Sequence, residues 1–127
     1  MEAQGTPDFV ELTSQHLSAI ARQDWDSYSS MCASDMTCFE PEARGALVVG
    51  LPFHHEYFTR PCGELPQTIC SPNISMLGPD CALICFTRLV QRRDEEGKPF
   101  TDRYEESRVW QKQDNAWKLV HLHRSAG

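Results

Sequence analysis

Three arginines lie on strand-like segments among apolar neighbours, and their charge is the first chemical feature of this sequence. In an extended strand, alternate side chains point to the same face. The neighbours that share a face with Arg88 are Ile84, Phe86 and Val90, those of Arg108 are Tyr104 and Trp110, and those of Arg124 are Val120 and Leu122. An unpaired charge on an apolar face costs free energy, so each guanidinium needs an anionic partner.

Two kinds of partner could satisfy these arginines. The first is an internal carboxylate, and the candidates are Glu40, Glu42, Glu105 and Glu106. We expect internal pairing for any single arginine but not for all three together. The second is a bound anion, which the planar, multi-donor guanidinium recognises well. A small carboxylate pocket is therefore a hypothesis, and His54 could line it as a hydrogen-bond donor or proton acceptor.

Neither a metal site nor a catalytic site follows from local motifs. The pairs His54-His55 and His121, His123 could each bind a metal ion, but no motif places a third ligand beside them, so we expect no metal and no cofactor. The sequence has no GxSxG, HExxH or glycine-rich phosphate loop, which excludes kinase activity. Tyr57, His54 and Asp35 could be combined into an acid/base site, but their spacing does not favour it.

Composition limits the class of protein. The chain has 127 residues, 40% of them hydrophobic and 24% charged, which fits one domain over residues 1–127 with a flexible terminus at 1–5. No stretch approaches the roughly 20 apolar residues of a membrane span, and no secretory signal begins the chain. We therefore expect a cytoplasmic protein without a membrane partner.

Charge and cysteine content exclude further classes. The net charge of −6 and the lack of basic runs argue against a nucleic-acid partner. The six cysteines form no CxxC pair, and several lie in apolar runs. We expect them to be reduced thiols that pack in the core rather than a disulfide framework.

The elements that must position the arginines can be read from periodicity and turn signals. Thr6-Pro7-Asp8 is typical of a helix start with Thr6 as the cap, and a long amphipathic helix should follow to about Ile20. Asp24 should cap a second helix whose inward face includes Cys32, and Pro52 should open a third that ends before Pro61.

Four long strands should follow these helices. The segments 67–77, 81–93, 100–112 and 116–124 are rich in apolar residues and are separated by turn signals such as Gly78-Pro79-Asp80. Helices followed by antiparallel strands predict an α+β domain in which the long helix packs across one face of a curved sheet. Apolar side chains crowd both faces of the last two strands, so association of subunits should bury the second face.

Several strings of the sequence resemble one known family. They are DWDSYSSMC (24–32), MTCFEPEARG (36–45), GLPFHHEYF (50–58), RYEESRVW (103–110) and WKLVHLHRSAG (117–127). In this order they resemble the association (hub) domain of calcium/calmodulin-dependent protein kinase II, from about residue 8 to the C-terminus. The FEPEA and VHxHRS strings are the most specific.

The resemblance implies a fold, an assembly and a pocket. The fold is the nuclear transport factor 2-like cone, and the assembly is a closed ring of stacked dimers, commonly of about twelve or fourteen subunits. Arg88, Arg108, Arg124 and His54 match positions at which the family binds small carboxylates. The family's tryptophan-bearing loop is replaced around 60–63, and its NPHxH histidines are Asn73 and Ser75 here.

Three functions follow from these observations. The first is a scaffold that assembles with itself, in 12 or more copies and with kinase-linked hub domains as further partners. The second is an isomerase- or dehydratase-like enzyme, because the cone fold hosts such enzymes. The third is a sensor in which a bound carboxylate changes the stability of the ring.

Overall fold

The long N-terminal helix is capped two residues later than predicted. The computed structural model describes residues 6–58 and 67–126. Helix α1 (Phe9–Ala21) is capped by Asp8, whose side chain accepts hydrogen bonds from the backbone amides two and three residues later. The prediction of Thr6 as the cap is wrong, because the carboxylate of Asp8 satisfies the free amides of the first turn. Within the described residues, no helix is long and apolar enough to cross a membrane.

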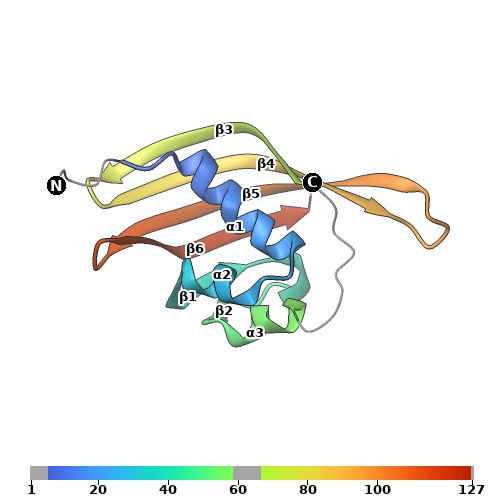
Figure 1. The fold of residues 1–127 in the computed structure, drawn as a ribbon, viewed down its shortest axis with the longest axis horizontal. Helices are drawn as coiled ribbons and strands as arrows, with labels where there is room; N and C mark the ends of the chain where they lie inside the picture. Colours follow the sequence, from blue (N-terminus) through green and yellow to red (C-terminus); the bar gives the residue numbers. More distant parts are fainter. Residues whose placement is uncertain (1–5, 59–66, 127) are drawn as a thin grey trace.

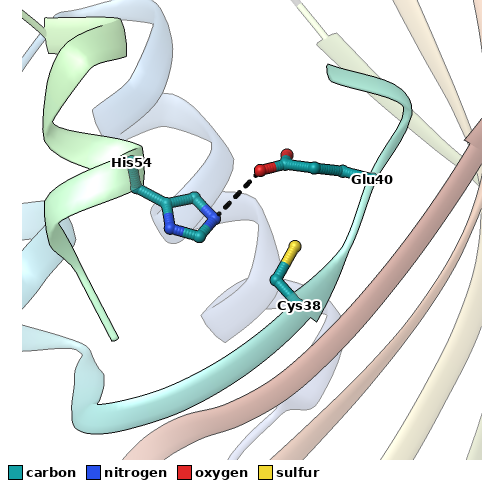
Figure 2. Close-up of side chains that lie close together, drawn as sticks. All are labelled: Cys38, Glu40 and His54. Atoms are coloured by element: carbon teal, nitrogen blue, oxygen red, sulfur yellow. Dashed lines mark ion pairs between the residues drawn. The ribbon is translucent and has the colours of Figure 1, made fainter. Parts of the chain in front are cut away.

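The second and third helices are shorter than α1. Helix α2 (Trp25–Ser30) is capped by Asp24 as predicted, but Cys32 lies on the following strand and not on the helix. Helix α3 (Pro52–His55) begins at the predicted proline and continues as a 3-10 turn, η2 (Glu56–Phe58). Figure 2 shows α3 directing a side chain toward the end of the first strand. The predicted helix end before Pro61 and the flexible terminus lie outside the described residues.

In the part of the chain that the structure describes, six strands form one sheet behind these helices. They are β1 (Cys32–Phe39), β2 (Val48–Val49), β3 (Gln67–Gly78), β4 (Cys81–Arg93), β5 (Pro99–Gln113) and β6 (Ala116–Ala126), with a 3-10 turn η1 (Pro41–Ala43) after β1. The order across the sheet is β2-β1-β6-β5-β4-β3. The four predicted strands are confirmed to within two residues at each end, and β1 and β2 were not predicted.

The sheet is mixed rather than antiparallel throughout. Strand β1 runs parallel to β6, with Thr37 opposite His121 and Cys38 opposite Leu122, whereas every other pair is antiparallel. The prediction of a purely antiparallel sheet is wrong in this respect, because it omitted β1. The parallel pair brings the end of β1 beside the end of β6, where Glu40 and Arg124 meet.

Burial along β4 and β6 tests the predicted faces. In β4 the even-numbered residues from Ala82 to Val90 are buried and the odd-numbered ones are half-buried, as the period of two requires. In β6 the register shifts opposite Val109 and Trp110, so that Leu119 rather than Val120 occupies the buried position. The prediction that Val120 lies on the same face of the strand as Arg124 is therefore wrong, because a bulge interrupts the alternation of side chains.

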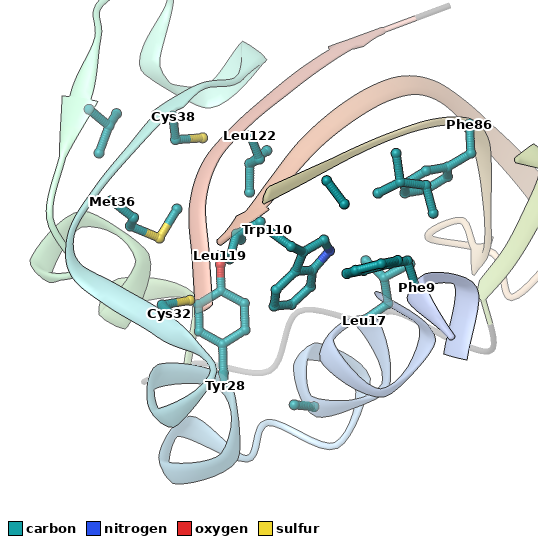
Figure 3. Close-up of a cluster of buried hydrophobic side chains, with 14 residues drawn as sticks. Phe9, Leu17, Tyr28, Cys32, Met36, Cys38, Phe86, Trp110, Leu119 and Leu122 are labelled. Carbon is teal, nitrogen blue, oxygen red and sulfur yellow. The ribbon is translucent and has the colours of Figure 1, made fainter. Parts of the chain in front are cut away.

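The core lies between α1 and the sheet. Its largest fully buried side chain is Trp110, whose indole nitrogen donates a hydrogen bond of 3.1 Å to the hydroxyl of Thr13 on α1. Figure 3 shows Trp110 between Leu17 of α1 and Leu119 of β6. Because a buried indole N–H needs an acceptor, this hydrogen bond fixes α1 over the C-terminal part of β5.

The elements form two layers with open edges. Helix α1 crosses one face of the sheet, and α2 and α3 lie near β1 at one end (Figure 1). The far part of the β4–β5 hairpin extends beyond the other strands (Figure 1). Strands β2 and β3 form the two edges of the sheet. These layers leave a hollow between the helices and the face of the sheet that carries the predicted arginines.

Candidate functional site

One cavity contains all four predicted site residues. It has a volume of about 180 Å³, and His54, Arg88, Arg108 and Arg124 all line it. The remaining lining residues are Ile20, Tyr28, Glu40, Glu42, Phe58, Arg92, Glu106 and Leu122. Three strands and α3 therefore bring together residues that are up to 70 positions apart in the sequence.

The first ion-pair group in the cavity consists of Arg88, Glu106 and Arg108, which we call the Glu106 group. Arg88 Nη1 lies 2.8 Å from Glu106 Oε2, and Arg108 Nε lies 2.8 Å from Glu106 Oε1. Arg108 and Glu106 are two apart on β5, and the β4–β5 register sets Arg88 diagonally beside them. Burial alone raises the pKa of Glu106, but Arg108 and Arg88 outweigh burial and hold that pKa below its usual value.

Side chains from α1 and β3 hold the two arginines of this group. Arg88 Nε donates to Gln67 Oε1 at 2.6 Å, and Arg108 Nη1 donates to His16 Nδ1 at 2.8 Å. Burial and then the charge of Arg108 hold the pKa of His16 well below its usual value, so the ring stays neutral and accepts this bond. The Nε2 of His16 lies 3.3 Å from the sulfur of Cys32. Arg108 is therefore fixed on both sides.

The second ion-pair group consists of Glu40, Glu42, His54 and Arg124, which we call the Glu40 group. Arg124 Nη2 lies 3.1 Å from Glu40 Oε2 and 2.6 Å from Glu42 Oε1, and Glu40 Oε1 lies 3.2 Å from His54 Nε2. Burial raises the pKa of Glu40, but His54 and Arg124 together lower it below its usual value. The guanidinium of Arg124 also lies over the ring of Tyr104, 4.6 Å from its centroid.

All three predicted arginines are therefore paired with internal carboxylates. The expectation that pairing would not serve all three together is wrong, because Glu106 binds two arginines at once and Glu40 and Glu42 share the third. Of the four candidate carboxylates, Glu105 is the exception: it is exposed and lies 3.7 Å from Arg103. The arginines nevertheless face the cavity.

Several residues of the site were not predicted. Tyr28 and Arg92 line the cavity, whereas His16 and Gln67 bond two of the arginines that line it. Tyr28 lies in the string DWDSYSSMC (24–32), but that string did not mark it as a site residue. A weak signal existed for His16, since it lies on the apolar face of a helix where a polar ring needs a partner. The other predicted histidines lie elsewhere: His55 is exposed against Trp25, and His121 bonds the hydroxyl of Thr37 at 2.7 Å.

A cluster of three potential metal ligands lies at the end of β1. The donor atoms of Cys38, Glu40 and His54 all lie within 4.8 Å of one another, and the three side chains point toward one another in Figure 2. All three residues are buried. Burial and then the charge of Glu40 raise the pKa of the Cys38 thiol, so the thiol is protonated when no cation is beside it.

Comparison with known proteins points to one family. The model of the "Calcium/calmodulin dependent protein kinase II association domain" matches residues 5–127. The chain is 42% identical to the calcium/calmodulin-dependent protein kinase type II alpha chain of Drosophila melanogaster over 94% of its own length, and it spans 23% of the length of that protein. It is 40% identical to the solved association domain of C. elegans CaMKII, with a TM-score of 0.88, covering 94% of this chain and 93% of that one.

A more distant neighbour identifies the fold class. A nuclear transport factor 2 (NTF2-like) superfamily protein from Salmonella enterica is 19% identical, with a TM-score of 0.74 over 94% of this chain and 88% of that one. At this identity the likeness shows the fold alone. The predicted α+β, NTF2-like fold is confirmed.

Proposed function

Because the chain belongs to the calcium/calmodulin-dependent protein kinase II association domain family, we propose that it is an oligomerisation hub that assembles with itself into a ring of stacked dimers. We propose 12 or more copies in each ring, as the resemblance implies. Such a ring holds tethered partners at a high effective concentration, which is its use as a scaffold. Hub domains linked to a kinase are proposed as further members of the ring, and the cytoplasm as its location.

The observation that carries this proposal is the open edge strand β3. From Ser71 to Gly78 every residue of this strand is exposed, and Ile74, Met76 and Leu77 are 40%, 45% and 59% exposed. A long edge strand with apolar side chains pairs readily with another chain, so proteins usually cover or charge it. Contact with another copy of the chain would cover this edge.

The second face of the sheet also supports assembly. Leu83, Leu89 and Val109 alternate with buried residues and therefore lie on the face away from α1, where they are only half-buried. The described helices lie on the other face (Figure 1). Docking of a second sheet would bury these side chains, and burial of apolar surface contributes roughly 25 cal/mol per Å².

The mass of the purified chain in solution tests the ring. We expect light scattering coupled to size-exclusion chromatography to give a mass of 12 or more chains, each of 14.5 kDa. A monomer or a plain dimer at micromolar concentration would contradict the ring and leave only the family fold.

Substitution of Met76 by lysine tests the part played by the edge. We expect Met76→Lys to reduce the assembly to smaller species, because a charged side chain on an edge strand opposes pairing. The matched control is Glu96→Lys in the exposed turn between β4 and β5, which introduces the same charged side chain away from the edge. An unchanged mass for Met76→Lys would show that β3 does not lie in the interface.

We also propose that the cavity binds a small carboxylate through Arg88, Arg108, Arg124 and His54. Four arginines and three glutamates line the cavity, and Asp102, which does not line it, lies 2.6 Å from Arg92. Because four carboxylates balance the four guanidinium groups, the support for anion binding is the planar, multi-donor guanidinium groups that line the cavity rather than an excess of charge. Ile20, Phe58 and Leu122 provide an apolar wall for the rest of a short ligand.

A pair of matched ligands tests this pocket. Butyrate and butyramide have nearly the same shape, but only butyrate carries a charge. We expect calorimetric titration to detect binding of butyrate and not of butyramide, and Arg108→Gln to abolish it while the circular dichroism spectrum stays native. Equal binding of both compounds would contradict recognition by the arginines. A change in the mass of the ring with butyrate would support the sensor hypothesis.

We propose no catalytic activity for this chain. The family matched is an association domain rather than a kinase domain. For the enzyme alternative, Asp35 is exposed and does not line the cavity, so it cannot act with His54 as an acid/base pair. The arginines, the glutamates and His54 of the cavity are held in ion pairs. Turnover of a small substrate that depended on His54 would contradict this view.

A further inference from the structure

The cluster at the end of β1 has the geometry of a metal site that no local motif predicts. Cys38 and Glu40 are two residues apart, so their side chains leave the chain on the same side, and His54 reaches them from α3 (Figure 2). Their side chains are almost completely buried. His54 therefore lies beside two further potential ligand atoms, which come from Cys38 and Glu40, about 15 residues earlier in the sequence.

The three donor types fit zinc better than other common cations. Zinc binds cysteine sulfur, histidine nitrogen and carboxylate oxygen, whereas calcium and magnesium prefer oxygen alone. Zinc–ligand bonds of roughly 2.0 to 2.3 Å place tetrahedral ligands roughly 3.3 to 3.8 Å apart. His54 Nε2 and Glu40 Oε1 are already 3.2 Å apart, and all the donors lie within 4.8 Å. Movements of side chains alone would complete the site.

We propose that Cys38, Glu40 and His54 bind one zinc ion, with the fourth coordination position open to the cavity. The ligand atoms would be the Cys38 sulfur, Glu40 Oε1 and His54 Nε2. The thiol proton and any proton on His54 Nε2 leave for solvent as the ion binds, because zinc binds the thiolate and the neutral imidazole.

The local charges favour a divalent cation. Glu40, Glu42 and Arg124 together leave one formal negative charge in the Glu40 group. A zinc ion with one bound thiolate adds one formal positive charge, so the whole group becomes neutral. Arg124 bonds the other oxygen of Glu40, Oε2, at 3.1 Å. It can therefore hold the carboxylate in place while Oε1 binds the metal, as outer partners of metal ligands commonly do.

The cavity supplies the open position. Glu40 and His54 line it, whereas Cys38 does not, so an ion held by all three would lie at its wall. The fourth ligand would be a water molecule or a small anion. The Glu106 group across the cavity carries one formal positive charge from two arginines and one glutamate, which favours an anionic fourth ligand.

Cobalt(II) is the probe that tests the site directly, because it replaces zinc and its bond to a thiolate absorbs in the near ultraviolet. The full chain is treated with EDTA, dialysed and titrated with cobalt. We expect one equivalent to bind, with a thiolate charge-transfer band and visible bands typical of four-coordinate cobalt, and zinc to remove both. No thiolate band, or binding well below one equivalent, would overturn the proposal without any variant.

Substitutions then assign the ligands. We expect Cys38→Ser to lose the charge-transfer band and to weaken zinc binding by more than about 100-fold, since loss of an outer partner alone costs about 10- to 100-fold. His54→Gln should weaken binding similarly. The matched controls are Cys32→Ser, which removes a buried cysteine 3.3 Å from His16, and His55→Gln, which removes the exposed neighbour of His54. Unchanged affinity in Cys38→Ser, or loss in Cys32→Ser alone, would overturn the assignment.

Assembly is measured on the same samples by light scattering, so the two proposals can fail separately. A large ring without a cobalt–thiolate band would overturn the zinc site and leave the hub proposal intact. A monomer that binds cobalt with a thiolate band would support the zinc site and overturn the hub proposal.

Discussion

The two ion-pair groups of the cavity both neutralise buried arginines with carboxylates, but they are built from different parts of the chain. In the Glu106 group, one fully buried carboxylate serves two arginines, and all three residues come from the neighbouring strands β4 and β5. In the Glu40 group, two carboxylates share one arginine, and the residues come from the position directly after β1, from η1, from α3 and from β6. The Glu106 group has a single carboxylate, whereas in the Glu40 group either Glu40 or Glu42 can still pair with Arg124 if the other is lost. Loss of a single carboxylate should therefore affect the two groups very differently.

Replacement of Glu106 should have the largest effect. In Glu106→Gln the buried arginines Arg88 and Arg108 lose their only charged partner in the group, and such a loss costs about 3 to 5 kcal/mol. We expect the urea midpoint to fall accordingly, or the chain to be largely unfolded without denaturant. A loss below about 1 kcal/mol would show that solvent in the cavity, rather than Glu106, stabilises these charges.

The same contrast explains what the sequence could predict. Arg88 and Arg108 could each be placed on the apolar face of its own strand because side chains in β4 and β5 alternate regularly. Glu106 was among the candidate partners, together with Glu40, Glu42 and Glu105. That it would bind two arginines depends on the register between the strands, which alternation alone does not fix.

The Glu40 group was harder to predict because it depends on β1. The segment Cys32–Phe39 has two exposed residues in succession, Ser34 and Asp35, which break the alternation typical of a strand. Its parallel pairing with β6 joins the start of the chain to its end, and no local signal reports such a contact. The cluster of Cys38, Glu40 and His54 follows from this pairing and from α3, so the sequence alone gave no reason to expect it.

Replacement of Glu40 should have an intermediate effect. In Glu40→Gln the amide can still accept from Arg124, which also keeps Glu42 at 2.6 Å, but a charged hydrogen bond is lost, and such bonds contribute about 1.5 to 3 kcal/mol. We expect a smaller fall in the urea midpoint than for Glu106→Gln. A larger fall than for Glu106→Gln would reverse the comparison and make the β1 end the more critical anchor.

Acid should weaken both groups in a defined range of pH. The pKa values of Glu106 and Glu40 are lower in the folded protein than the usual 4.5, so the unfolded chain binds more protons in this range. Their stabilising contribution is complete above about pH 4.5 and is lost as the pH falls through the folded values. We expect urea midpoints of the wild-type chain to fall below pH 4.5, and those of Glu40→Gln to fall less steeply. Parallel profiles would show that the pKa of Glu40 is not lowered by folding.

Replacement of Glu42 should have the smallest effect and most sharply tests the idea of a spare carboxylate. The side chain of Glu42 is 44% exposed, so water screens its pairing with Arg124, and exposed ion pairs contribute about 0 to 1 kcal/mol. In Glu42→Gln, Arg124 still has Glu40 at 3.1 Å and the ring of Tyr104. We expect a change in the urea midpoint equivalent to less than about 1 kcal/mol. If the double variant Glu40→Gln, Glu42→Gln loses much more than the sum of the single variants, each carboxylate can replace the other, and the redundancy that distinguishes this group from the Glu106 group is real; additive losses would mean that the two carboxylates act independently.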